Sequence, residues 1–153
     1  MALHRSQYEG LAAFRHALRQ FLAFSEAATQ AAGVTPQQYQ ALLVIKTEAR
    51  GEVMIRVLAE RMLLQHNSAV QLIDRLASAD LVARKHSPTD ARSVLVALTA
   101  KGSKLLEQLA SNHFDELLRH EPLLAESLRR LRRMERDPAR ATANAENGAS
   151  ARR

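Results

Sequence analysis

Polar side chains of the kind that bond to base edges recur along one face of a predicted helix over residues 66–79. Asn67 and Gln71 lie on this face and Ser68 flanks it. A side-chain amide bonds adenine through two hydrogen bonds, and Val70 on the other flank suits the methyl group of thymine. The face therefore predicts contact with the major groove of DNA, and a solvated helix surface is the alternative. The apolar stripe opposite consists of Ala69, Leu72, Ile73 and Leu76.

Two side chains near this face have two interpretations each. His66, at the start of the helix, is suited to donate to a phosphate or to cap the helix locally. Arg75 is placed either to reach a phosphate or to pair with an acidic residue on a neighbouring helix.

Cations cluster in the segment that follows. Residues 81–86 and 93–98 alternate as β-strands do, and Pro88 and Asp90 between them predict a hairpin loop. Cations on a protruding hairpin suit phosphates or a narrow minor groove, whereas a solvated charged hairpin is the alternative. Arg84 has a further alternative, which is an ion pair with Asp90 or Asp80. The cations are Arg84, Lys85, His86 and Arg92.

Helices must position these side chains, and their boundaries are visible in the sequence. The segment Thr35-Pro36-Gln37-Gln38 combines an N-cap, a proline at the first helical position and a capping-box glutamine, so a helix starts there. A brief strand near residues 53–55 and a short helix over 56–62 come next. Residues 63–65 break the chain before the polar helix. Two helices joined by a tight turn and followed by a hairpin predict a winged helix-turn-helix.

Long helices flank this central part. Ser6 and Glu9 form a capping-box pattern before a helix that lasts until about Ala32. A helix of this length is easier to explain if its apolar stripe meets a second subunit. Thr99 is a plausible N-cap for the next helix, and Pro122 is expected to start a last one. The predicted fold is mainly α with a small β-hairpin.

The same residues resemble a known family, the MarR transcriptional regulators. The resemblance rests on Leu58-Ala59-Glu60, Ser68-Ala69-Val70, Leu72-Ile73-Asp74-Arg75-Leu76 and Leu81-Val82. It also rests on the hairpin, where Arg84 and Asp90-x-Arg92 precede an apolar strand that ends in Leu98-Thr99-x-x-Gly102. It covers roughly residues 5–136. Leu63 and Asp80 stand where many relatives have glycine. Asp80 tolerates a left-handed conformation, while Leu63 implies a turn without positive φ or a junction of different shape.

The resemblance implies a homodimeric, ligand-responsive repressor that binds a pseudo-palindromic operator in double-stranded DNA. Residues 5–33 and 100–136 would form the dimerisation region, and residues 34–99 the winged helix-turn-helix. Gln65 to Gln71 would begin the recognition helix, and Arg92 would lie at the wing tip. Asp90 would orient an arginine near the tip. The expected effector is phenolic or another small anion, and Arg15 and His16 are the candidates to line its pocket.

Composition sets limits on function. The 153 residues carry 22 Lys+Arg against 16 Asp+Glu, a net charge of +6 that fits an anionic partner. With no cysteine, disulfides, thiolate metal sites and thiol redox sensing are excluded. The six histidines show no metal-binding spacing, so no metal and no cofactor is predicted. No catalytic motif occurs, and we predict that the chain is not an enzyme.

The remaining expectations concern location and the C-terminal segment. No signal peptide or membrane span is visible, which favours a cytoplasmic protein without a membrane partner. The arginines of residues 129–136 are interpreted as the solvated face of a terminal helix. Residues 137–153 contain no large apolar side chain and are predicted to be disordered. The alternative function is a non-enzymatic helical interaction module whose basic surface serves acidic partners.

Overall fold

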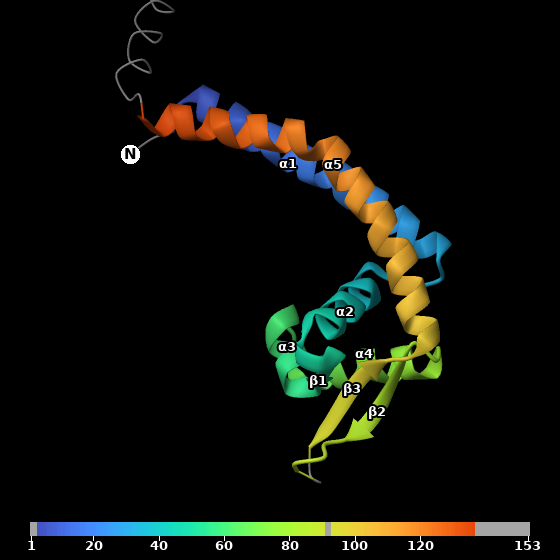
Figure 1. Ribbon diagram of the computed structural model, residues 1–153. Helices are drawn as coiled ribbons and strands as arrows, with labels where there is room; N and C mark the ends of the chain where they lie inside the picture. The colour runs from blue at the N-terminus through green and yellow to red at the C-terminus, as the bar shows by residue number, and fades with distance from the viewer. Residues whose placement is uncertain (1–2, 91–92, 137–153) are drawn as a thin grey trace, which may run out of the picture. The chain divides into compact units, whose positions relative to one another are not determined.

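The computed structural model describes residues 3–90 and 93–136. Six helices and three strands follow one another along the described chain (Figure 1). The elements are α1 (Arg5–Ala31), α2 (Pro36–Thr47), the 3-10 turn η1 (Ala49–Gly51), β1 (Glu52–Met54), α3 (Ile55–Met62), α4 (His66–Ser78), β2 (Val82–His86), β3 (Val94–Leu98) and α5 (Ala100–Arg136). The mainly helical fold with a small β-structure is therefore confirmed.

The start of α2 follows its sequence signals. The Thr35 hydroxyl accepts a hydrogen bond from the Gln38 amide at 3.1 Å, and the Gln38 side chain accepts one from the Thr35 amide at 2.8 Å. This reciprocal pair, with Pro36 in the first helical turn, confirms the predicted capping box. At α1 the prediction was wrong. The helix begins at Arg5, and the Gln7 side chain accepts a hydrogen bond from the His4 amide, so this bond forms two residues before Ser6. Glu9 pairs with Arg5 instead.

Three helices end on a residue in the left-handed conformation, namely Gly33 (φ 75°), Leu63 (φ 55°) and Asp80 (φ 59°). At Leu63 the next amide, that of Leu64, donates to the Ala59 carbonyl at 2.9 Å, and the Leu63 amide donates to the Glu60 carbonyl at 3.2 Å. This is the Schellman arrangement, which satisfies carbonyls that the helix end leaves free. The turn thus requires positive φ at Leu63, and a turn without it is excluded.

We predict that Leu63→Gly raises the free energy of unfolding by about 1 kcal/mol, because glycine adopts the left-handed conformation without a Cβ penalty. The Leu63 side chain is 94% exposed, so its removal creates no cavity. Chemical denaturation measures the difference. Leu63→Ala keeps the strained Cβ and is the matched control, with an expected change within about 0.5 kcal/mol. Equal stability of the glycine and alanine variants would contradict the strain at this turn.

The strands form one antiparallel sheet in the order β1-β3-β2. Val53 pairs with Val96, and Val96 pairs with Arg84 on its other side. The predicted hairpin is thus present and gains a third strand, β1, from before the helix-turn-helix. Directly paired residues share a face of a sheet, so Glu52, Ala97, Ala83 and Lys85 lie on the face opposite Arg84 and Val96.

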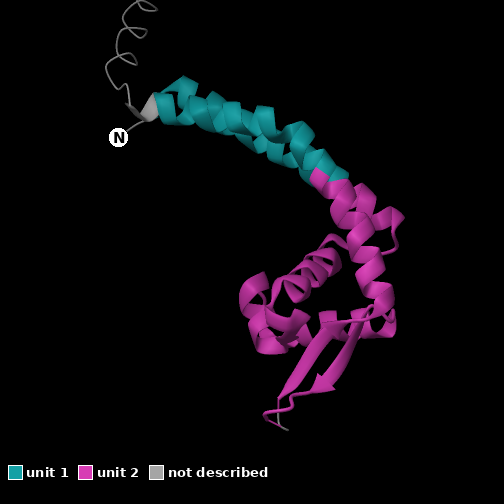
Figure 2. Cartoon of the chain, in the orientation of Figure 1, with its two compact units in different colours: residues 1–24, 115–153 teal, residues 25–114 magenta. Residues whose placement is uncertain are grey.

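The chain divides into two compact units (Figure 2). The second unit, residues 25–114, contains the helix-turn-helix and the sheet around one apolar core. Its fully buried side chains include Leu42, Ile45, Leu58, Ile73, Leu76 and Val96. Leu106 and Leu109 of α5 join this core, so the start of α5 is part of the winged lobe.

The first unit consists of residues 1–24 and 115–153 and contains the beginning of α1 and the end of α5. Phe21 and His120 meet edge to face with ring centroids 6.4 Å apart, and Ala17 and Ser127 are buried. Large apolar side chains nevertheless remain exposed on both helices. These are Tyr8, Leu11, Leu18 and Leu22 of α1 and Leu117, Leu118, Leu123 and Leu128 of α5.

A second prediction, which concerns the start of the last helix, is wrong. Pro122 does not start a separate helix but lies inside α5, which continues for 37 residues. A proline in a helix removes one backbone hydrogen bond, at a cost of about 3 kcal/mol. Leucines recur at helical spacing on both sides of Pro122, and one continuous helix keeps them in register. The predicted tail, residues 137–153, lies outside the described residues.

Candidate nucleic-acid interface

The helix α4 presents the predicted polar face to solvent. Asn67, Ser68 and Gln71 are exposed and Val70 is half-buried, while the apolar stripe at Ala69, Leu72, Ile73 and Leu76 is buried. The packing of this stripe fixes the rotation of α4 about its own axis. The three polar side chains are therefore held outward, and none of them makes a hydrogen bond to a residue that the structure describes.

The N-terminus of α4 is also open. Gln65 is its N-cap residue, but the Gln65 side chain makes no capping hydrogen bond. His66 is the first helical residue. Its side chain is exposed and makes no hydrogen bond or ion pair to another described residue. The first-turn amides of a helix carry partial positive charge, and anions bind readily to them. The local capping interpretation for His66 loses its support here.

The C-terminal end of α4 is clamped to the start of α5. The Thr99 hydroxyl donates to the Asp80 carbonyl at 2.6 Å and accepts from the Gly102 amide at 3.0 Å. The Lys101 ammonium donates to the Ala79 carbonyl at 2.8 Å. A Cβ on Gly102 would lie 1.9 Å from the Leu81 carbonyl oxygen, so only glycine fits there. The Leu-Thr-x-x-Gly pattern thus fixes the position of α4 and of the wing relative to α5.

Arg84 is paired within the lobe. Its guanidinium forms an ion pair with the Asp74 carboxylate of α4, and the two side chains are 36% and 57% exposed. The alternative partners Asp80 and Asp90 were therefore wrong, because β2 runs alongside α4 and turns Arg84 toward it. Asp74 belongs to the polar face of α4, and its 10-residue separation from Arg84 gave no sequence signal. The pair ties the wing to the recognition helix.

Lys85 is paired on the opposite face of the sheet. Its ammonium lies 2.9 Å from the Glu52 carboxylate of β1, across the central strand β3. His86, at the end of β2, is exposed. Two of the three described wing cations are thus bound to carboxylates of the lobe. These two ion pairs hold the hairpin against the rest of the lobe.

The wing loop is organised around Asp90 and Ser93. The Ser93 hydroxyl donates to the Asp90 carboxylate at 2.9 Å, and the Ser93 amide donates to the Asp90 carbonyl at 3.0 Å. The Ser87 amide in turn donates to the Ser93 carbonyl at 2.9 Å, which closes the loop. Arg92 lies outside the described residues. The Asp90 carboxylate and carbonyl thus both bond within the loop.

Three further candidate side chains are exposed. Arg75 is exposed near the end of α4 without an ion pair to any described residue. Arg15 and His16 are exposed on α1 in the first unit. On the last part of α5, hydrogen bonds from Arg129 and then Arg133 hold the pKa of Glu126 below its ordinary value.

Two further observations bear on the class of site. No three His, Cys, Asp or Glu side chains gather as a metal site would require within residues 3–90 and 93–136. In the same ranges, no helix has the length and apolarity that a bilayer span needs.

The buried His113 contacts other residues of the second unit. Its ring stacks on Tyr39 at 4.3 Å and bonds the Ser25 hydroxyl at 2.8 Å, and burial raises the pKa of Tyr39.

A helix-turn-helix followed by an antiparallel wing defines a winged helix-turn-helix protein. Residues 32–93 match the model of the MarR family. The chain is 30% identical over 94 residues to the HTH-type transcriptional repressor MdtR of Bacillus subtilis, covering 61% of this chain and 59% of that protein. The winged helix-turn-helix part of the chain is thus similar to the MarR family. The chain spans 57–59% of the length of the curated relatives it matches, and these are named as transcriptional regulators rather than enzymes.

Solved structures share the whole fold. The MarR family regulator AbsC of Streptomyces coelicolor superposes with a TM-score of 0.72 at 20% identity, covering 95% of this chain and 99% of that chain. Sco3205 from the same organism was solved in complex with DNA. It superposes with a TM-score of 0.69 at 20% identity, covering 90% of this chain and 89% of that chain. The likeness confirms the winged-helix fold, including the flanking helices α1 and α5.

Proposed function

We propose that this chain is a DNA-binding transcriptional regulator that recognises its operator with α4 and the wing. The observation that carries the proposal is the exposed face of Asn67, Ser68 and Gln71 on a helix that a buried stripe, a clamp to α5 and an ion pair to β2 hold in place. Exposed amide and hydroxyl groups suit base edges in the major groove. The match of residues 32–93 to the MarR family model and the DNA complex of Sco3205 support the same function.

The proposed regulator is a homodimer. Exposed leucines on α1 and α5 form an apolar surface in the first unit that a monomer rarely leaves in water. Two copies joined through residues 5–33 and 100–136 would present two winged lobes, residues 34–99, to a pseudo-palindromic operator. Half-site centres are expected about 10 bp apart, which is one turn of the duplex.

The proposed regulator is a ligand-responsive repressor. The relative MdtR is named a repressor, which supports this direction of regulation. A phenolic or other small anionic effector would act by binding one spacing of the two lobes more tightly than the other. Arg15 and His16 are proposed to contact this effector. Both are exposed on α1 with no ion pair to another described residue, so their polar groups are free to bind it.

Fluorescence anisotropy tests the central proposal. The full chain is titrated with a duplex from its own promoter region and with a random duplex of equal length, across a series of salt concentrations. Regulation requires a specificity ratio well above about ten that survives physiological salt. Equal binding to both duplexes, or binding to neither, would refute it and favour a basic interaction module for acidic proteins.

We expect Arg92→Ala to weaken operator binding by about 1–3 kcal/mol and to reduce the salt dependence, since a wing arginine displaces counterions from the groove. The same anisotropy titration measures both effects. Arg130→Ala is the matched control, because Arg130 lies exposed on the last part of α5 and should leave both quantities unchanged. Wild-type binding by the Arg92 variant would show that the wing does not enter a groove.

The dimer has its own test. We expect the wild-type chain to sediment at twice its 17.0 kDa mass at micromolar concentration. Leu22→Glu together with Leu118→Glu places charge on the exposed apolar surface and should give monomers that remain folded, since both side chains are exposed in the single chain. Leu63→Glu changes a still more exposed leucine outside this surface and should stay dimeric. A wild-type monomer would refute the claim.

A further inference from the structure

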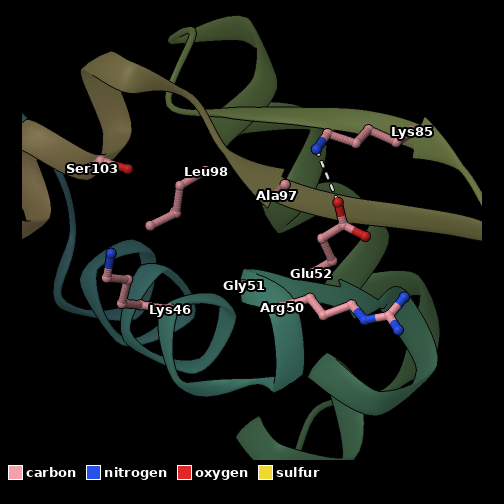
Figure 3. Close-up of a pocket in the computed structure, with 8 residues that line it drawn as sticks. All are labelled: Lys46, Arg50, Gly51, Glu52, Lys85, Ala97, Leu98 and Ser103. Atoms are coloured by element: carbon pink, nitrogen blue, oxygen red, sulfur yellow. Dashed lines mark hydrogen bonds and ion pairs between the residues drawn. The ribbon is translucent and has the colours of Figure 1, made fainter.

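The outer face of the sheet carries an open cavity of about 230 Å³, and Lys85 is the one candidate DNA-contacting residue in its lining. It lies between the end of α2, the turn η1, the sheet and the first turn of α5, all within the second unit (Figure 3). Lys46 and Ser103 stand at one end, and Arg50 and the Lys85–Glu52 pair stand at the other. No sequence pattern indicates Lys46, Arg50 or Ser103, because they come from three separate segments.

The lining is positively charged beyond what its own carboxylate balances. Lys46, Arg50 and Lys85 supply three cations against the single carboxylate of Glu52. Glu52 is bonded to Lys85, whereas the side chains of Lys46 and Arg50 make no hydrogen bond or ion pair to any described residue. The net charge of +2 matches the dianion that a phosphate monoester carries near neutral pH.

The backbone beneath the cavity is strained where it presents one of these cations. Arg50 has φ 63° and ψ 8°, inside η1, and Gly51 follows at φ 66°. A residue with a side chain in the left-handed region costs about 1–2 kcal/mol, and such strain clusters at ligand-binding positions. Arg50 is exposed, so no packing of its side chain offsets this strain.

The chemistry of the cavity favours a phosphoryl group over an aromatic acid. Its lining contains no aromatic side chain, and its apolar part is limited to Gly51, Ala97 and Leu98. Ser103 adds a hydroxyl donor in the first turn of α5, where the helix dipole contributes positive potential. Ammonium, guanidinium and hydroxyl donors around a small volume are the groups that hold phosphate oxygens.

We propose that this cavity binds a small phosphate, either free or as a monoester, through Lys46, Arg50 and Ser103. Its lining includes no residue of α4 and neither Arg15 nor His16, so it would give the regulator a second chemical input. Lys85 lines the cavity, belongs to β2 of the wing and pairs with Glu52 of β1. A bound anion would therefore lie next to a cation of the wing.

The test is an NMR titration of the full chain with inorganic phosphate, without DNA, against chloride at equal ionic strength. We expect saturable shifts of the Gly51, Glu52 and Ser103 amides. Lys46→Gln and Arg50→Gln should each weaken phosphate binding at least fivefold. Lys104→Gln removes a neighbouring exposed cation of α5 that does not line the cavity and should bind phosphate as the wild type does.

Three outcomes would overturn the proposal. Absence of saturable shifts removes the site, and equal affinity of acetate and phosphate makes it a carboxylate site. Weaker binding of Lys46→Gln to random duplex, without phosphate shifts in the free protein, assigns the cavity to the DNA backbone instead. Since the titration contains no DNA, its result stands whether or not the chain proves to be a transcriptional regulator.

Discussion

Gly102→Ala is expected to destabilise the second unit by about 3 kcal/mol or more. The new Cβ would lie 1.9 Å from the Leu81 carbonyl oxygen and 2.9 Å from its carbon, and both are backbone atoms that no side-chain rotation relieves. Alanine favours a helix by about 1 kcal/mol over glycine, but the overlap is larger than this gain. Either α5 moves away from Leu81, or the start of β2 shifts.

The shift would not stay local. The Leu81 carbonyl accepts the Thr99 amide at 3.1 Å, and the Thr99 hydroxyl reaches the Asp80 carbonyl, so the same displacement breaks the clamp at the end of α4. We therefore expect operator affinity to fall together with stability. A binding loss without any loss of stability would contradict this account.

Thermal unfolding measures the effect. A loss of 3 kcal/mol corresponds to a fall in Tm of roughly 6–12 °C for a chain of this size. Gly33→Ala is the matched control, because Gly33 has φ 75° but nothing within 4 Å of an added Cβ. Gly33→Ala tests backbone strain without steric overlap, and we expect it to lower the free energy of unfolding by about 1 kcal/mol. If both variants lose the same stability, the close approach of α5 to Leu81 is wrong.

The sequence predicted the elements that local chemistry specifies. Thr35, Pro36 and Gln38 marked the start of α2, and the spacing of Ala69, Leu72, Ile73 and Leu76 gave the buried side of α4 correctly. These signals depend on neighbours within one or two turns, which a single sequence displays.

What the sequence did not predict depends on contacts between distant segments. Asp74 and Arg84 meet only because β2 folds back along α4, and Glu52 and Lys85 are 33 residues apart on strands that do not pair directly. Pro122 was interpreted as a helix start because a local rule places proline there, but leucine spacing on both sides of it continues α5. The positive φ of Leu63 follows from the backbone bonds that close α3 rather than from the residue type.

The largest effect on recognition is expected from the polar face of α4. Asn67→Ala and Gln71→Ala each remove an amide that can bond one base through two hydrogen bonds, worth about 1–3 kcal/mol per contact. In a homodimer each contact occurs in both half-sites, so a single substitution should cost about 2–6 kcal/mol of operator affinity. Both side chains are exposed, so the stability of the protein should change by less than about 0.5 kcal/mol.

The pattern of loss distinguishes base contact from a nonspecific role. An amide displaces no counterion, so affinity for random duplex and the slope of affinity against salt should stay at the wild-type values. Gln108→Ala removes the same amide from an exposed position on α5 and serves as the control, with unchanged operator binding. A symmetric base substitution at the contacted position should weaken the wild type and leave the matching variant unaffected. If every base substitution weakens variant and wild type equally, α4 does not select the sequence, and specificity must come from the wing or from the shape of the DNA.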